Sequence, residues 1–358
     1  MNTDESDSYR ILIVGGSGGV GKTSISAALA LQACLDGHRT LLLTIDPARR
    51  LSTAMGIDRI GAEATDITEH LEAAGHSPRG SLHAMMLDAK RTLDRIVEKH
   101  ARTPDQKDRI LNNRLYRNVS TRLGGSQEYA AMQCLADIAD SAEYDRIIVD
   151  TPPSAHALDF LDAPRRLRAL FDSKLVKVFI SFGSRAGRGF FRVSDLLFKA
   201  LERLTGSQAI AELAEFFETA ESLFEPFNAR SERAEQVLHD PSSAFLVVTG
   251  PNQDQLEQAH DFKMALDEMD MQVTRFIVNR HLEPRLEQPV PVVTPDDETP
   301  DLEARIKRWG SMLEKMAHDQ ANLIANLSEQ SGLEVTAVPQ MDEDIHSLSG
   351  LARLAGHL

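Results

Sequence analysis

The sequence predicts an α/β protein with a doubly wound, mostly parallel sheet and an inserted helical subdomain. Seven apolar, β-rich runs alternate with helix-length amphipathic stretches, a pattern typical of parallel strands joined by helices. A glycine-rich segment separates the first apolar run from the first helix-like stretch. In such sheets, ligands bind at the carboxyl ends of the strands. The expected strands are residues 10–15, 40–45, 81–87, 146–150, 244–250, 275–279 and 334–338.

The middle of the chain, residues 165–240, lacks convincing strand runs and contains ten of the 14 phenylalanines. We therefore expect a core built on the sheet from residues 1–164 and 241–358, interrupted by this helical insertion over residues 165–240. Two Phe-rich runs in it, residues 175–182 and 190–198, either line an apolar groove or form the subdomain's own core.

Two further segments follow the insertion in the sequence. Residues 283–300 hold five prolines and several acids, which predicts an extended surface loop. A long helix is expected over about 301–330.

Composition excludes several classes of function. The net charge of −15 disfavours non-specific binding to nucleic acid and to anionic membranes. The polar, acidic N-terminus does not resemble a secretory signal, and no apolar run is long enough for a transmembrane helix. The two cysteines, Cys34 and Cys134, lie among apolar neighbours and are expected to be buried hydrophobes without a disulfide. A cytoplasmic location fits these features.

The segment from Gly16 to Thr23 matches the phosphate-loop pattern G-x-x-x-x-G-K-[ST] and lies between an expected strand and an expected helix. Glycines allow consecutive backbone N–H groups to surround phosphate oxygens, and the helix N-terminus adds partial positive charge. We expect Lys22 to reach the β- and γ-phosphates and the Thr23 hydroxyl to bind Mg²⁺. The expected phosphate-binding residues are Gly16, Ser17, Gly18, Gly19, Val20, Gly21, Lys22, Thr23 and Ser24.

Two acidic residues follow other expected strands. Asp46 comes directly after the second apolar run, where a carboxylate near the phosphates can orient or deprotonate the attacking water. The alternative is an Asp-Pro turn that only ends the strand. Asp150 ends a hydrophobic run, as a Walker B acid does when it reaches Mg²⁺ through bound water, and the Thr-Pro-Pro after it predicts a stiff loop.

These motifs resemble those of the ArsA family, which contains arsenite-pump ATPases and the cytosolic ATPases that target tail-anchored proteins. The phosphate loop, residues 46–52 (DPARRLS) and residues 150–158 (DTPPSAHAL) correspond to the family's nucleotide motifs, in the same order. The resemblance implies an ATPase with bound Mg²⁺, in which Asp46 positions water and Asp150 is linked to the metal. It also implies that Asn279 recognises adenine and that Pro339 lies in the loop over the base; the role of His156 stays open.

The sequence departs from the family pattern at two places. The family usually has a lysine, which reaches across a dimer to the partner's nucleotide, where this chain has Ser17. Arg49 and Arg50 replace the family's His-Asn. We hypothesise that one of the two arginines supplies the missing charge; the alternatives are two solvated arginines, or a heteromeric partner that carries its own lysine.

The resemblance and these departures leave the biological role open. Binding of arsenite is disfavoured, because two cysteines cannot build a three-thiolate site. One phosphate loop per chain implies a homodimer, or a heterodimer with a related ATPase. The main hypothesis is ATP hydrolysis that switches the dimer and gates a hydrophobic peptide or protein client held by the helical subdomain; the alternative is an ATP-binding scaffold with little turnover. A ParA- or MinD-type ATPase is a third, less favoured interpretation, since the C-terminal residues 345–358 lack the basic face of a membrane-binding helix.

Overall fold

The computed structural model describes most of the chain. Two compact units are formed, one by Met1–Met86, Glu143–Ala157 and Leu238–Leu358, the other by Leu87–Ala142 and Leu158–Val237. The predicted domain limits stay a prediction, because much of residues 165–240 lies outside the described part. The described residues are 9–46, 50–57, 60–122, 126–153, 161–162, 165–166, 169, 173, 207–285 and 302–358.

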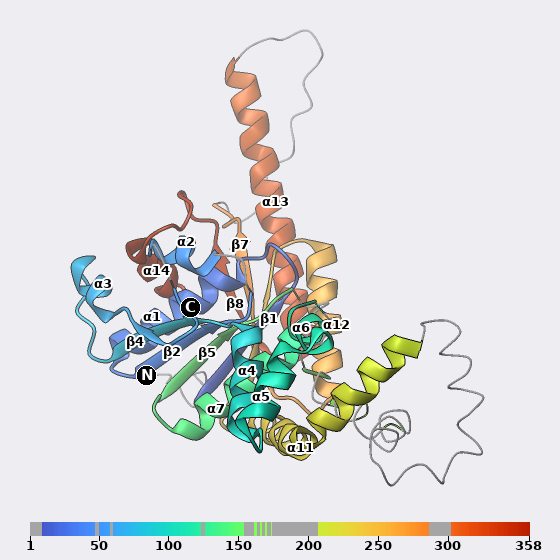
Figure 1. The fold of residues 1–358 in the computed structure, drawn as a ribbon. Coiled ribbons are helices and arrows are strands. Elements are labelled where there is room, and N and C mark those ends of the chain that lie inside the picture. The colour runs from blue at the N-terminus through green and yellow to red at the C-terminus, as the bar shows by residue number, and fades with distance from the viewer. Residues whose placement is uncertain are drawn as a thin grey trace. The chain divides into compact units, whose positions relative to one another are not determined.

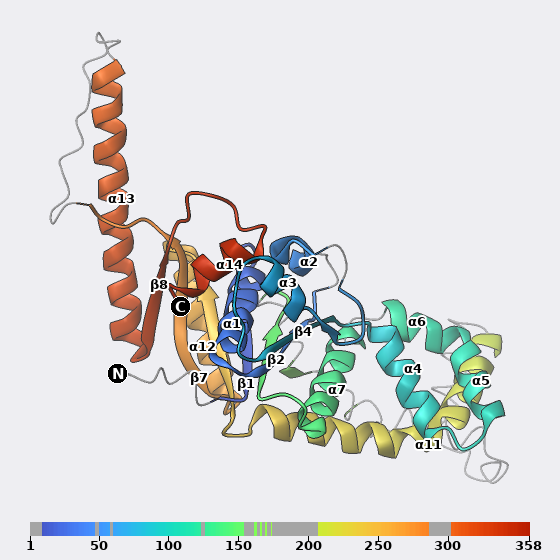
Figure 2. The same cartoon turned by 90° about the vertical axis from the view of Figure 1, so that its left-hand side faces the viewer.

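The first unit contains a sheet whose eight strands, among the described residues, have the order β3-β4-β2-β5-β1-β6-β7-β8 (Figures 1 and 2). All neighbouring strands are parallel except β3 and β4. The α/β fold with a mostly parallel sheet is therefore confirmed, and each of the seven predicted strands is present. The strands are β1 (Ile11–Gly16), β2 (Arg39–Thr44), β3 (Thr65–Asp66), β4 (Ser81–Met86), β5 (Arg146–Asp150), β6 (Ser243–Thr249), β7 (Val273–His281) and β8 (Glu334–Pro339).

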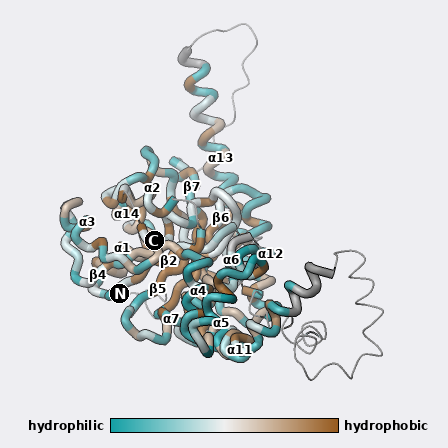
Figure 3. Tube along the Cα trace, in the orientation of Figure 1, coloured by the Kyte–Doolittle hydropathy of each residue, from teal (hydrophilic) through white to brown (hydrophobic). Residues whose placement is uncertain are grey.

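Helices cover both faces of this sheet. Leu12 and Val14 of β1 point to the face where α1 and α14 pack, in one apolar cluster with Ile25 and Leu351. Gly15 points to the opposite face, where a Cβ on it would lie 2.5 Å from the ring of Phe262 in α12. Successive residues alternate between the two faces and both faces are covered, so the central strands of the sheet are largely apolar (Figure 3). The helices are α1 (Lys22–Asp36), α2 (Arg50–Met55), α3 (Thr68–Ala73), α12 (Gln253–Glu268), α13 (Leu302–Ser331) and α14 (Leu348–Ala355).

The second unit is helical in its described residues. Its core contains Leu93, Tyr116, Tyr129 and Leu223, and Phe216 packs against them. Its helices are α4 (Ala89–His100), α5 (Pro104–Asn112), α6 (Arg114–Arg122), α7 (Ser126–Ser141) and α11 (Ser207–Leu238).

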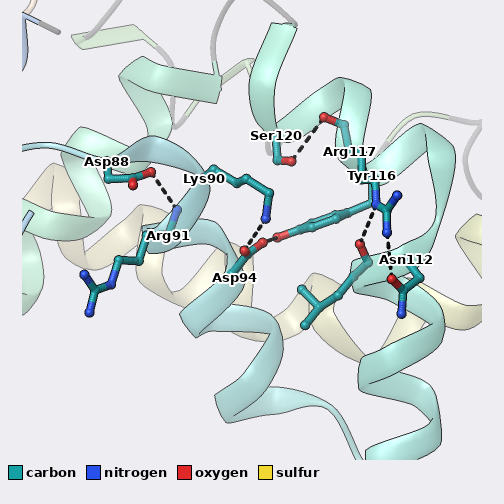
Figure 4. Close-up of polar contacts among 9 residues, drawn as sticks. Asp88, Lys90, Arg91, Asp94, Asn112, Tyr116, Arg117 and Ser120 are labelled. Atoms are coloured by element: carbon teal, nitrogen blue, oxygen red, sulfur yellow. Dashed lines mark hydrogen bonds and ion pairs between the residues drawn. The ribbon is translucent and has the colours of Figure 1, made fainter.

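Polar contacts fix the helix ends and crossings of this unit (Figure 4). The Asp88 side chain caps α4 by accepting a hydrogen bond from the Arg91 backbone N–H at 2.9 Å. The Tyr116 hydroxyl donates to Asp94 at 2.8 Å, and Lys90 also contacts Asp94. Because Tyr116 and Asp94 lie on different helices, this hydrogen bond ties α6 to α4.

Several predictions about the middle of the chain fall outside the described residues. They include the two Phe-rich runs, residues 175–182 and 190–198. Most of the proline-rich segment 283–300 lies outside as well, whereas the long helix expected after it is α13. Cys34 and Cys134 are both free and buried, as predicted. Within the described residues, no helix is long and apolar enough to cross a membrane.

Candidate nucleotide-binding site

The loop between β1 and α1 requires glycine at two positions. Gly16 has a φ of 145°, and a Cβ there would lie 1.9 Å from the Val248 carbonyl oxygen. Gly21, the residue before α1, has a φ of 95°, and a Cβ there would lie 2.4 Å from Asn279 Nδ2. A larger residue at either position would therefore displace the loop or the atoms that it contacts.

Lys22 is the first residue of α1 and is buried, with 7% of its surface exposed. Its Nζ donates hydrogen bonds to the carbonyl oxygens of Gly16, at 2.9 Å, and Ser17, at 2.8 Å. Burial lowers the pKa of Lys22 to about 8, an effect that the nearby Asp150 carboxylate partly offsets. Lys22 is therefore still cationic at neutral pH, and its ammonium group lies against the loop that would surround the phosphates.

Asp150 lies at the end of β5 and is fully buried. One oxygen, Oδ2, accepts hydrogen bonds from the hydroxyls of Thr23 and Thr44, both at 2.9 Å. The other, Oδ1, is buried and has no hydrogen-bond partner among the described residues. Burial raises the pKa of Asp150 to about 6, although the two hydroxyls lower it.

The residues around Asp150 fit a bound Mg²⁺ ion. A buried carboxylate oxygen without a partner needs a donor or a cation, and the Thr23 hydroxyl lies on the same carboxylate. Thr23 and Asp150 are therefore the residues that would hold Mg²⁺, directly or through its bound water.

Asp46 and Arg50 lie together on the same side of the site. The Arg50 guanidinium is 3.2 Å from Asp46 Oδ2, and both residues line the same pocket as Lys22. Arg50 also lowers the pKa of Lys22, an effect smaller than those of burial and of Asp150. Arg49 and His156 fall outside the described residues, so their predicted places stay predictions.

The opposite side of the pocket is formed by the ends of β7 and β8. Asn279 is buried and donates its side-chain N–H to the Val20 carbonyl oxygen at 2.8 Å. Asn279 therefore anchors the phosphate loop, a role that sequence reasoning did not assign to it. Pro339 and Met341 line the pocket beside it.

The pocket has a volume of about 650 Å³, which is within the range of small-molecule sites. Nine of the predicted residues line it: Gly19, Gly21, Lys22, Thr23, Ser24, Asp46, Arg50, Asn279 and Pro339. Gly16, Ser17, Gly18 and Val20 belong to the same loop but do not line the pocket. Asp150 does not line the pocket, but it accepts a hydrogen bond from Thr23, which does. Ser17 is buried, and its hydroxyl has no partner among the described residues.

Sequence reasoning missed several residues of the site. From the sequence, no role was assigned to Thr44. Thr44 ends one apolar strand and Asp150 ends another, and the structure shows that the two residues are partners in the β2–β5 register. Arg280 also lines the pocket. Its backbone has a φ of 64° and lies at a register shift between β7 and β8, which no sequence motif indicates. The segment before α14, including Ile345, also lines the pocket.

The doubly wound fold and the geometry of this site are consistent with the P-loop class of nucleoside triphosphatases. The profile of the anion-transporting ATPase family matches residues 9–358, and the chain belongs to this family, the ArsA family.

Three relatives show how far the similarity extends. A Chlorobaculum tepidum protein, provisionally named an arsenical pump-driving ATPase, is 34% identical over 158 residues, covering 44% of this chain and 36% of the relative. The ATPase GET3 of Malassezia globosa is 28% identical over 197 residues, 55% of this chain and 54% of the relative. The ATPase ASNA1 homolog 1 of Paramecium tetraurelia is 24% identical over 352 residues, 98% and 92% of the two chains. The chain thus spans between a third and about half of the length of the first two of these relatives.

Proposed function

We propose that this chain binds ATP with Mg²⁺ and hydrolyses it, and that turnover opens and closes a dimer that gates a client or partner held by the helical subdomain. The observation that carries the proposal is the convergence of Lys22, Thr23, Asp46 and Asp150 at the carboxyl ends of three neighbouring strands. Membership in a family of ATPases supports it.

Each residue has a role that its contacts support. The phosphate loop binds the phosphates, and Lys22 exchanges its two carbonyl acceptors for phosphate oxygens. Bound Mg²⁺ would neutralise charge on the β- and γ-phosphates. Asp46 orients a water molecule and accepts its proton as the water oxygen bonds to the γ-phosphorus and the bond to ADP breaks.

Asn279 and Pro339 are proposed to hold the adenine. One N–H of the Asn279 side chain already binds Val20, which leaves the amide oxygen as an acceptor and the second N–H as a donor for the base. An acceptor suits the amino group of adenine better than the carbonyl of guanine, which favours ATP over GTP.

The second candidate function is an ATP-binding scaffold or regulatory subunit with little turnover. Two features favour it: Ser17 stands where the resemblance to the family leads us to expect a lysine, and Arg50 forms an ion pair with the proposed water-orienting residue, Asp46. Hydrolysis would then depend on a partner, or on Arg50 moving from Asp46 to the phosphates.

We also propose that arsenite is not the ligand. Burial raises the pKa of Cys34 to about 11 and that of Cys134 to about 12, so neither thiol is a ready thiolate ligand. The proposed client is a hydrophobic peptide or protein.

Calorimetric titration of the full chain with ATP, with and without Mg²⁺, tests the binding step. We expect Lys22→Ala to weaken ATP binding at least 10-fold, because it removes the buried cation of the loop. Lys263→Ala is the matched control, since Lys263 pairs with Asp267 on α12 and does not line the pocket. Equal binding by the wild type and Lys22→Ala would refute the proposed site.

A further inference from the structure

One face of α13 exposes an apolar stripe. Five of the six exposed large hydrophobic side chains in the described part of the chain lie on this helix. Trp309, the only tryptophan of the chain, is 62% exposed, which is unusual for a residue that normally hides most of its surface. The stripe consists of Ile306, Trp309, Met312, Leu313 and Met316.

The rotation of α13 that exposes this stripe is fixed by polar contacts on its other face. Glu314 is buried; it accepts a hydrogen bond from the Arg285 backbone N–H at 3.2 Å, and its other oxygen is 3.6 Å from His318. Ser311 and Ala317, on the same face, are also buried. Between residues 306 and 317 the helix thus turns small and polar residues inwards and large apolar residues outwards, the reverse of an ordinary surface helix.

The stripe lies on the half of α13 that extends past the sheet. The C-terminal half packs on β7 and β8, and the N-terminal half continues beyond the carboxyl ends of these strands (Figures 1 and 2). Apolar and polar residues alternate along this half (Figure 3). Ile306, Trp309, Leu313 and Met316 follow each other at intervals of three, four and three residues, which is the spacing of a coiled-coil seam.

We propose that α13 pairs with α13 of a second copy of this chain, as an antiparallel two-helix seam. In the register set by the spacing, Ile306 packs on the partner's Met316, and Trp309 packs on the partner's Leu313. Met312 then meets the partner's Met312 at the two-fold axis.

Three features of the stripe favour a second copy over another occupant. First, the stripe is a ridge on one projecting helix, which fits the ridge and grooves of a similar helix better than an extended peptide. Second, Arg305 and Asp319 are both exposed and flank the stripe at its two ends, so the antiparallel register places Arg305 opposite the partner's Asp319. Third, the stripe would bury on the order of 1,000 Å² over both copies, about what a specific interface needs.

This inference goes beyond the proposed function, because the stripe residues do not line the nucleotide pocket. Pairing through α13 is expected without ATP, and Lys22→Ala should pair as the wild type does. A failure of ATP binding and a failure of pairing are therefore separate results.

Sedimentation velocity of the full chain over a range of concentrations, without nucleotide, tests the proposal. We expect the wild type to dimerise with rising concentration, while its Trp309 emission shifts to shorter wavelength. Leu313→Glu should weaken dimerisation at least 10-fold. Met264→Glu is the matched control, since Met264 is 46% exposed on α12, outside the stripe, and this variant should dimerise as the wild type does. Circular dichroism shows whether each variant is folded.

Two further variants test the register. Met312→Cys should form an interchain disulfide on mild oxidation, whereas Met264→Cys should not; Cys34 and Cys134 are buried and add no background. Arg305→Asp and Asp319→Arg should each weaken pairing, and the double variant should restore it. The proposal is overturned if the wild type stays monomeric, or if Met264→Glu weakens pairing as much as Leu313→Glu. Two results of the Trp309 emission measurement would also overturn the proposal. Emission that is already at short wavelength at every protein concentration would mean that residues of the same chain, such as 286–301, cover the stripe. Emission that shifts only when an apolar helical peptide is added would mean that the partner is another protein.

Discussion

Thr44 and Asp150 lie side by side at the carboxyl ends of β2 and β5, where the Thr44 hydroxyl donates to Asp150 Oδ2 at 2.9 Å. Thr23 donates to the same oxygen from the first turn of α1. Two neighbouring strands and the phosphate loop therefore meet on one buried carboxylate. If Thr23 turns to Mg²⁺, Thr44 can continue to hold Asp150 in place.

Asp150→Asn should stabilise the protein in the absence of nucleotide and metal. The pKa of Asp150 is raised from 3.8 to about 6, so the folded state binds more protons than the unfolded state between these values. The stability contributed by this group is present below pH 3.8 and is lost as the pH rises to about 6. Denaturant unfolding in EDTA should show a gain of about 1–3 kcal/mol at pH 7.5 and little gain at pH 4. A gain of the same size at both pH values would contradict this account.

The affinity for ATP should fall as the pH rises above about 8. The pKa of Lys22 is lowered to about 8 in the free protein, and bound phosphate raises it again, so binding takes up a proton between pH 8 and about 10. The dissociation constant, measured at pH 7, 8 and 9, should change little up to pH 8 and rise several-fold by pH 9. Lys22→Arg, which stays charged, should lose this dependence. The account fails if the two proteins show the same slope.

Arg50→Ala should lower kcat by 10- to 1,000-fold with little effect on KM, if Arg50 leaves Asp46 to supply the charge that Ser17 cannot. Arg50→Lys should retain part of the rate. The same measurement on Arg49→Ala decides which arginine acts. Parental rates for both alanine variants would disprove the hypothesis that either arginine supplies the charge that Ser17 lacks.

Asn279→Ala should weaken ATP binding by about 10- to 100-fold, because it removes both the anchor on the Val20 carbonyl and the acceptor proposed for adenine. The preference for ATP over GTP should shrink as well. Asn322→Ala, at an exposed position of α13, is the control and should bind as the wild type does. Unchanged affinity and unchanged preference in Asn279→Ala would remove Asn279 from the site.

The sequence predicted the fold well because seven strands are continuous apolar runs that no other element explains. It missed β3, whose two exposed residues, Thr65 and Asp66, form a strand only by pairing with β4. The acids of the site could be predicted because parallel strands end at one edge of a sheet. The contacts of Thr44, Arg50 and Asn279 could not, since they depend on strand register and on which side chains meet across the pocket.

Steady-state phosphate release from Mg-ATP is the most direct test of the central claim, which is that this site hydrolyses ATP through Asp46. We expect the wild type to release phosphate at least 100-fold faster than Asp46→Asn, which should bind ATP within about threefold of the wild type. Asp261→Asn, on the exposed face of α12, should release phosphate at the wild-type rate. Equal release by the wild type and Asp46→Asn, with ATP bound to both, would contradict the account and favour the scaffold function.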